Sequence, residues 1–274
     1  MRRGHRDDPE TGEFADERVF ASATEVRYVL QDASDDADAL VVAFSAAHPP
    51  DTPPRYYTHK ALRGLPCPRL FILDDQGPRE PLPRPCWYLG GNRLFDVADS
   101  VLDLLGAIAG ELGVPKHRVI TCGASKGGWA ALYFAARFGA GHAVAGEPQV
   151  MLGKHLCQEE NASIAAHVAG DVSQATSDFL DGLLFEALRE NRDDPPTVHL
   201  FSGRTLYYER DVLPLVAFLE EQRIDCQLEL GDHTEHVPDL GLNYPVYLRR
   251  RLEQLLASDR RPAGRRPDLA VPRP

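Results

Sequence analysis

Apolar residues in this chain gather in short consecutive runs, separated by longer segments in which they recur every three or four positions. Runs that are apolar at consecutive positions are typical of strands covered on both faces. We predict strands over residues 25–31, 39–45, 69–75, 86–90, 118–123, 142–146, 197–203 and 226–230. The longer spacing predicts helices over residues 96–113, 126–139, 210–223 and 243–257. Strands that alternate with helices indicate βαβ units and a mainly parallel central sheet flanked by helices.

One segment breaks this alternation. Residues 150–194 show helical spacing only, so we expect a small helical cap inserted between two strands of one α/β domain. The domain itself is expected over residues 21–257. Residues 1–20 and the Arg/Pro-rich tail 258–274 offer little apolar surface to bury, and we expect both to be disordered.

Composition narrows the classes of function. The chain has 274 residues, 43% hydrophobic and 26% charged, which is ordinary for a globular protein. No apolar run approaches the roughly 18 residues of a membrane span, and the first residues lack the apolar stretch of a signal sequence. We therefore expect a cytoplasmic protein without integral membrane association. The net charge of −11, with basic residues clustered only in the tail, disfavours nucleic-acid binding.

No residue pattern calls for a metal or an organic cofactor. The five cysteines are scattered and form no C-x-x-C pair, so buried free thiols are the expected state. The stretch "DHTEH", residues 232–236, could be taken as a metal cluster, but it lacks the H-E-x-x-H frame of a helical zinc site.

The stretch "TCGASKGGW", residues 121–129, places Ser125 between two glycines, where a predicted strand meets a predicted helix. This is the placement of a nucleophile elbow, in which small neighbours let strand and helix pass closely. The alternative is a serine that merely caps the helix. In the elbow interpretation the backbone N–H of Lys126 is one oxyanion donor. The backbone N–H of Ser45, which directly follows the apolar run "VVAF", is expected to be the second.

Two nucleotide-binding interpretations of the same stretch fail on spacing. A phosphate-binding loop needs G-x-x-x-x-G-K-[ST], and the residue after the lysine here is glycine. A dinucleotide fingerprint needs glycine where this chain has Ser125.

A serine nucleophile needs a base and an acid that orients the base, and α/β-hydrolase topology supplies them in the chain order serine, acid, histidine. His233 and His236 follow the last predicted strand, and Glu209 and Asp211 follow the strand before it. The order is satisfied. Chain order alone leaves both histidines open as the base.

Four runs, "YLGGNRLFDVADSV", "VITCGASKGGWAALYFAARFG", "HAVAGEPQVMLG" and "HVPDLGLNYPVYL", resemble α/β-hydrolase-like proteins of bacterial surface-glycan systems. These include capsular polysaccharide biosynthesis proteins and the accessory Sec protein that modifies glycans on exported adhesins. The resemblance covers roughly residues 40–256. It implies the α/β-hydrolase fold and serine-dependent acyl transfer or ester hydrolysis, with carbohydrate O-acetylation as the chemistry.

Carried over by position, the resemblance makes Ser125 the nucleophile and His236 the histidine that acts as the base. We then expect His233 to be a solvated loop residue. Many such hydrolases have Asp soon after "SG", whereas this chain continues "RTLYYERD", so we assign the acid to Glu209 and keep Asp211 in reserve. The expected substrate is a small-molecule or glycan acyl group. Two alternatives stay open: a thioesterase with an apolar tunnel under the cap, lined by Phe179, Leu183, Leu184 and Phe185, and a non-catalytic scaffold of a glycan biosynthesis or export complex.

Overall fold

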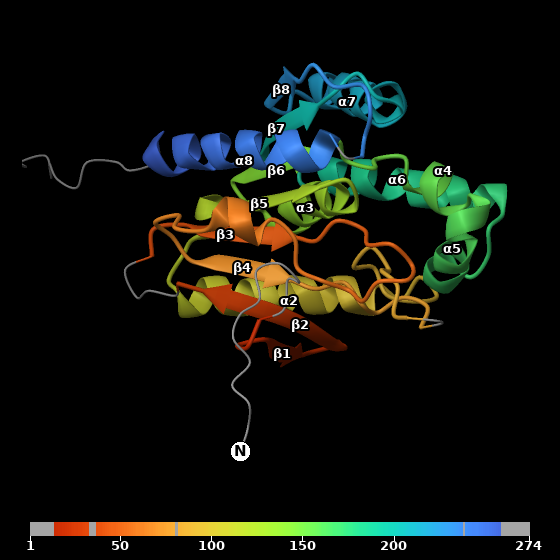
Figure 1. Ribbon diagram of the computed structural model, residues 1–274, viewed down its shortest axis with the longest axis horizontal. Coiled ribbons are helices and arrows are strands. Elements are labelled where there is room, and N and C mark those ends of the chain that lie inside the picture. Colours follow the sequence, from red (N-terminus) through yellow and green to blue (C-terminus); the bar gives the residue numbers. More distant parts are fainter. Residues whose placement is uncertain (1–13, 33–36, 80–81, 238, 259–274) are drawn as a thin grey trace, which may run out of the picture.

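The computed structural model describes residues 14–32, 37–79, 82–237 and 239–258, and an eight-stranded sheet lies at its centre (Figure 1). The strands follow the spatial order β1-β2-β4-β3-β5-β6-β7-β8. Their bounds are β1 Arg18–Ala21, β2 Glu25–Gln31, β3 Leu40–Phe44, β4 Arg69–Ile72, β5 Val119–Ala124, β6 His142–Gly146, β7 Thr197–Ser202 and β8 Cys226–Leu230. From β4 to β8 every neighbouring pair is parallel, whereas β1 pairs antiparallel with β2 and β2 with β4.

Helices cover both faces of the sheet and bury a separate apolar core on each. The larger core packs under α2 (Asp96–Glu111), α3 (Lys126–Phe138), α6 (Gln174–Glu190) and α7 (Leu213–Gln222). The smaller core packs under α8 (Asp239–Ser258), which crosses the opposite face in Figure 1 and contacts α1 (His59–Leu62). Shorter helices complete the description: η1 Lys116–Arg118, α4 Leu152–Leu156, η2 Glu159–Asn161, α5 Ala162–Ala169 and the π-helix η3 Tyr208–Val212. The mainly parallel sheet flanked by helices confirms the expected fold class.

Two details of the strand prediction were wrong. Strand β1 was missed because three of its four residues are exposed, so it carries no apolar run. The predicted strand 86–90 does not form. Trp87 and Tyr88 have φ of 54° and 58°, and this left-handed backbone cannot continue a strand. Both side chains are nevertheless fully buried, which explains why the segment has the apolar pattern of a strand.

The helical segment 150–194 forms α4, η2, α5 and α6 as expected, but its longest helix belongs to the layer beside the sheet. Helix α6 packs against α3 and α4. Leu183 and Leu184 on α6 are buried in the larger core, and Phe185 packs edge-on against Phe218 of α7. The apolar side chains proposed for a tunnel are therefore occupied with packing; the outermost part of the segment is α5 (Figure 1).

The ordered chain begins earlier than expected, since residues 18–20 belong to β1. The rest of the expected disordered ends, residues 1–13 and 259–274, lies outside the described residues. Within the described part of the chain, no helix is both long and apolar enough to cross a bilayer. In the same part, no group of His, Cys, Asp and Glu side chains is arranged to hold a metal ion. All five cysteines are free thiols, three of them buried.

Candidate active site

Ser125 stands at a sharp bend between β5 and α3. Its φ of 55° and ψ of −119° are rare for a residue with a side chain, and such strain persists only where the surroundings impose it. Here they do, because the Ser125 N–H donates to the Gly146 carbonyl at 2.8 Å, and the Trp129 N–H donates back to the Ser125 carbonyl at 3.1 Å. The predicted elbow is present. The Ser125 hydroxyl makes no capping bond to the helix, so the alternative of a simple N-cap does not describe it.

The two glycines of the motif are required by close backbone contact. A Cβ at Gly123 would lie 2.3 Å from the Gly127 carbonyl oxygen, and a Cβ at Gly127 would lie 2.4 Å from the Phe44 carbonyl oxygen. Strand β5, helix α3 and the end of β3 thus meet backbone to backbone. Any side chain at either position would push the serine out of its bend.

His236 reaches Ser125 from the loop between β8 and α8, as predicted. Its Nε2 lies 3.1 Å from Ser125 Oγ, and its Nδ1 lies 2.5 Å from Oε2 of Glu147. The Tyr207 ring lies over the imidazole with a centroid distance of 4.1 Å. An ionised carboxylate only accepts hydrogen bonds, so Nδ1 carries the proton and Nε2 is left to accept from the serine hydroxyl.

Glu147 is the carboxylate that is hydrogen-bonded to His236, and it was not among the predicted site residues. It directly follows β6, its side chain is fully buried, and its φ is 38°. Burial alone raises the pKa of Glu147, but hydrogen bonds from His236, from the Gly203 N–H and from His233 outweigh it, so the pKa is lowered. The carboxylate is therefore ionised at neutral pH despite its burial.

The assignment of the acid to Glu209 is wrong in its geometry. Glu209 is exposed on the π-helix η3, and the imidazole of His236 is bonded to Glu147 instead. The reserve candidate Asp211 is buried and accepts from the Met151 N–H at 2.7 Å while pairing with Arg210, so it fixes the start of α4. The sequence held a partial signal: Glu147 directly follows the predicted strand 142–146, and parallel strands end at one edge of the sheet. Only the structure shows that this strand lies beside β5.

His233 was also placed wrongly, since it is buried rather than solvated. Only 4% of its side chain is exposed, and its Nε2 lies 2.7 Å from Oε1 of Glu147. The same oxygen accepts the Gly203 N–H at 2.8 Å. Each oxygen of Glu147 thus has an imidazole as partner.

The oxyanion donors differ in part from the prediction. The Lys126 N–H belongs to the first turn of α3, whose amides have no acceptor within the helix, and it stays the proposed first donor. The Ser45 N–H is instead donated to the Tyr88 hydroxyl at 2.8 Å, which contradicts its proposed role. The next residue along the loop, Ala46, lines the cavity beside Ser125. We therefore propose the Ala46 N–H as the second donor.

The Lys126 side chain points into the core, and Lys126 does not line the cavity that contains Ser125. Its Nζ lies 2.8 Å from Asp74 Oδ2 and 4.4 Å from the centre of the Tyr88 ring. Burial lowers the pKa of Lys126, while Asp74 opposes the shift. Asp74 also accepts the backbone N–H groups of Cys86 and Tyr88. This buried pair ties the elbow to Tyr88, which in turn holds the loop that follows β3.

A cavity of about 690 Å³ opens beside Ser125 and His236. Its walls come from the loop after β3, from residues 55–61 and from the start of α8, and none come from the segment 150–194. Among the described residues that line it there is no Asp or Glu, whereas Arg55, Lys60 and three histidines are present. On a chain with a net charge of −11, this lining favours a ligand that carries negative charge.

No protein-family model matches the chain, and the search of curated proteins finds no similar sequence. Solved structures do match. One is a chain of the Glycosylation Associate Protein (Gap123) complex from Streptococcus agalactiae, with a TM-score of 0.74 and 16% identity over 90% of this chain and 47% of that one. The present chain thus spans about half the length of that neighbour.

Two further neighbours are matched over nearly their whole length. The capsule O-acetyltransferase of Neisseria meningitidis serogroup A has a TM-score of 0.68 and 18% identity, over 83% of this chain and 91% of that one. The fluorophosphonate-binding serine hydrolase FphF of Staphylococcus aureus has a TM-score of 0.62 and 14% identity, over 88% and 97%. Together with the strand order and the elbow after β5, these likenesses identify the fold of the chain as that of the α/β-hydrolases.

Proposed function

We propose that the protein is a serine-dependent acyltransferase or esterase that acts on O-acetyl groups of a capsular or protein-linked glycan. The observation that carries the proposal is the hydrogen-bonded chain from Ser125 Oγ through His236 to Glu147. Nucleophile, base and orienting acid lie at hydrogen-bond distance from one another, with the nucleophile in a strained bend beside a cavity. We infer an acetylated glycan as the substrate from the resemblance in sequence and from the similarity in structure to the capsule O-acetyltransferase.

The chemistry proceeds through an acyl-enzyme. His236 Nε2 takes the Ser125 proton as Oγ attacks the acyl carbonyl, and Glu147 stabilises the imidazolium that forms. The N–H groups of Lys126 and Ala46 stabilise the oxyanion. The imidazolium then returns the proton to the leaving group. Water or a sugar hydroxyl, deprotonated by His236, then attacks the acyl-serine, the bond between the acyl carbon and Ser125 Oγ breaks, and His236 returns the proton to Oγ.

The lining of the cavity favours an acyl donor or acyl acceptor that carries negative charge. Arg55 and Lys60 place positive charge on a wall with no opposing carboxylate among the described lining residues. A related capsule O-acetyltransferase structure holds CoA, whose phosphates carry this kind of charge. An acyl donor that bears phosphate, or an acidic glycan acceptor, fits such a wall.

The alternatives have less support. The apolar side chains named for a thioesterase tunnel pack into the core, and the cavity beside Ser125 lies away from their helix. A non-catalytic scaffold would not need Ser125 to have a strained backbone and a hydroxyl that is hydrogen-bonded to an imidazole.

The test is turnover with a chain-length series of p-nitrophenyl esters, followed by acetyl-CoA with an acetylatable glycan. The proposal predicts turnover of the acetyl ester that falls with longer acyl chains, and acetyl transfer to the glycan or release of its acetyl groups. All of these activities are lost in Ser125→Ala. Preference for long-chain thioesters would favour the thioesterase, and an inert wild-type protein would favour the scaffold.

A further inference from the structure

His233 shares the buried carboxylate with His236, although the proposed chemistry uses only one histidine. Oε2 of Glu147 faces His236, and Oε1 faces His233 Nε2 at 2.7 Å. Thr205 Oγ1 lies 3.3 Å from Oε2, and the Gly203 N–H completes the set of donors on Oε1. A fully buried carboxylate is thus held by four donors, two of them imidazoles.

The protein is shaped around the His233 ring. A Cβ at Gly203 would lie 2.6 Å from Nε2 of this ring, and a Cβ at Gly231 would lie 2.8 Å from its Nδ1. The Phe201 ring stacks on the imidazole at a centroid distance of 5.6 Å and an interplanar angle of 26°. Two glycines and an aromatic ring thus leave a slot that fits one flat side chain.

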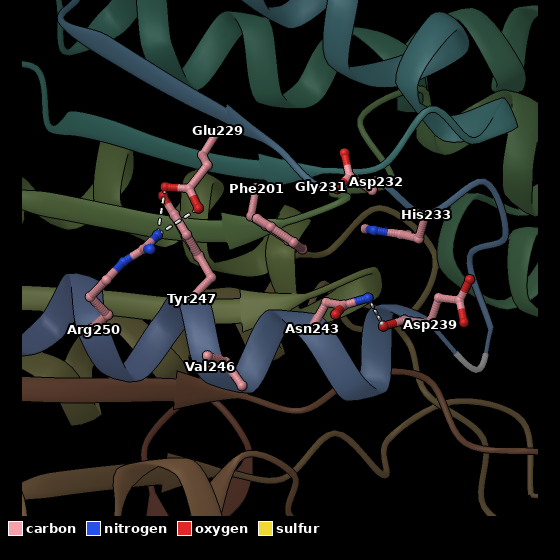
Figure 2. A pocket seen from close by; sticks show the side chains of 10 residues that line it. All are labelled: Phe201, Glu229, Gly231, Asp232, His233, Asp239, Asn243, Val246, Tyr247 and Arg250. Atoms are coloured by element: carbon pink, nitrogen blue, oxygen red, sulfur yellow. Dashed lines mark hydrogen bonds and ion pairs between the residues drawn. The ribbon is translucent and has the colours of Figure 1, made fainter.

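Figure 2 shows where this slot lies in the molecule. His233 stands at the edge of a groove of about 540 Å³ between β8 and α8, beside Gly231 and Phe201. The groove is separate from the cavity beside Ser125, and no residue lines both. The link between His233 and the residues beside Ser125 is therefore the hydrogen bond to Glu147.

The hydrogen bonds assign the proton of the ring. Oε1 of Glu147 belongs to an ionised carboxylate and can only accept, so Nε2 of His233 is the protonated nitrogen. Nδ1 is buried and has no hydrogen-bond partner among the described residues. A ring with its proton on Nε2 satisfies the contact to Glu147 and leaves the buried Nδ1, which has no acceptor to donate to, without a proton.

We propose that His233 is a positioning residue of the active site: its Nε2–H holds Glu147 so that the other carboxylate oxygen orients His236 toward Ser125. The inference rests on the proposed function, because it assigns to His233 an effect on the reactivity of Ser125. Loss of the donor leaves Oε1 with the Gly203 N–H alone. The carboxylate then turns more freely and becomes more basic. A base displaced by about 1 Å costs up to about 100-fold in rate.

The experiment measures the rate of fluorophosphonate labelling of Ser125 across pH in three variants. His233→Leu keeps an apolar side chain in the slot but removes the donor. We expect labelling to slow roughly 10- to 100-fold and its acid limb to move to higher pH, since a more basic Glu147 favours proton uptake by the His236–Glu147 pair. His233→Gln keeps a neutral N–H that can reach Glu147. We expect it to restore the labelling rate to within about threefold of the wild type, with the acid limb of the pH profile where the wild type has it. Asp232→Asn, the exposed neighbour, is the control for charge near the groove.

The outcomes separate the two proposals. A wild-type protein that is not labelled overturns the proposed function and this inference with it. A labelled wild type with a folded His233→Leu variant of equal rate and unchanged acid limb overturns the inference alone. If His233→Leu does not fold, ¹⁵N NMR of the wild-type histidines decides, since the inference requires the proton of His233 on Nε2 and is contradicted by a proton on Nδ1.

Discussion

Glu147 Oε2 accepts a hydrogen bond from His236 Nδ1 at 2.5 Å, across 89 positions of sequence. The contact fixes which nitrogen of the imidazole carries the proton and therefore which one can accept from Ser125. It also brings a negative charge beside the ring that becomes positive during the reaction. Since no other carboxylate contacts the His236 imidazole among the described residues, we propose Glu147 as the acid.

Glu147→Gln tests that assignment. An amide in this place removes the negative charge and can donate to Nδ1, which would force the proton onto the nitrogen that must accept from Ser125. We expect acetyl-ester turnover to fall roughly 10³- to 10⁴-fold. The matched control is Glu209→Gln on the exposed π-helix, for which turnover within about twofold of the wild type is expected. Equal losses in both variants, or a loss only in Glu209→Gln, would contradict the assignment.

The pairing of Glu147 also makes stability depend on pH. Its pKa is lowered from the ordinary 4.5, so it contributes stability that is fully present above that value and is lost as pH falls through the lower folded-state pKa. The free energy of unfolding of the wild type, measured by urea denaturation, should therefore approach that of Glu147→Gln as pH falls below about 4.5. A difference between the two proteins that stays constant from neutral pH to this range would speak against an ionised, hydrogen-bonded Glu147.

Because Lys126 and Asp74 form a buried ion pair, we expect substitutions at the two residues to have strongly coupled effects on the free energy of unfolding. Lys126→Met leaves the Asp74 carboxylate in the core without its cation, and we expect the free energy of unfolding to fall by roughly 3–5 kcal/mol. The double variant Lys126→Met with Asp74→Asn removes both charges and should be less destabilised than the sum of the two single variants. Urea denaturation of the four proteins gives the coupling free energy. Strict additivity would mean that the pair does not hold the elbow to the Tyr88 loop.

The positive wall of the cavity predicts a charge-dependent Michaelis constant. Arg55→Ala and Lys60→Ala should raise KM for acetyl-CoA, more steeply at low ionic strength, and leave kcat for uncharged p-nitrophenyl acetate within about twofold. Lys154→Ala, an exposed lysine on α4 away from the cavity, is the matched control. If the lysine on α4 has the same effect as the two cavity residues, net charge and not the cavity wall attracts the donor.

Local pattern was sufficient to predict the parts of the site that local structure creates. The apolar run of β5, the glycines around Ser125 and the start of α3 predict the elbow, because a sharp bend needs small neighbours on both sides. His236 could be predicted from its place after the last strand. These features depend on residues near one another in the sequence.

The acid and the second histidine depend on distant residues, and the prediction failed there. Glu147 lies within hydrogen-bond reach of His236 because β6 is the neighbour of β5, an arrangement that became definite only with the sheet order. His233 is buried because Gly203 and Gly231 leave room for its ring on two different strand ends. The Ser45 amide failed as an oxyanion donor because the turn at Tyr88 brings a hydroxyl to it.

Fluorophosphonate labelling followed by peptide mapping tests most directly whether His236 and Glu147 activate Ser125. We expect one label per chain on Ser125 of the wild type, no label in Ser125→Ala, and strongly slowed labelling in His236→Ala and Glu147→Gln. A wild-type protein that stays unlabelled, or that is labelled equally well without His236, would contradict the claim that this histidine and its buried carboxylate activate Ser125.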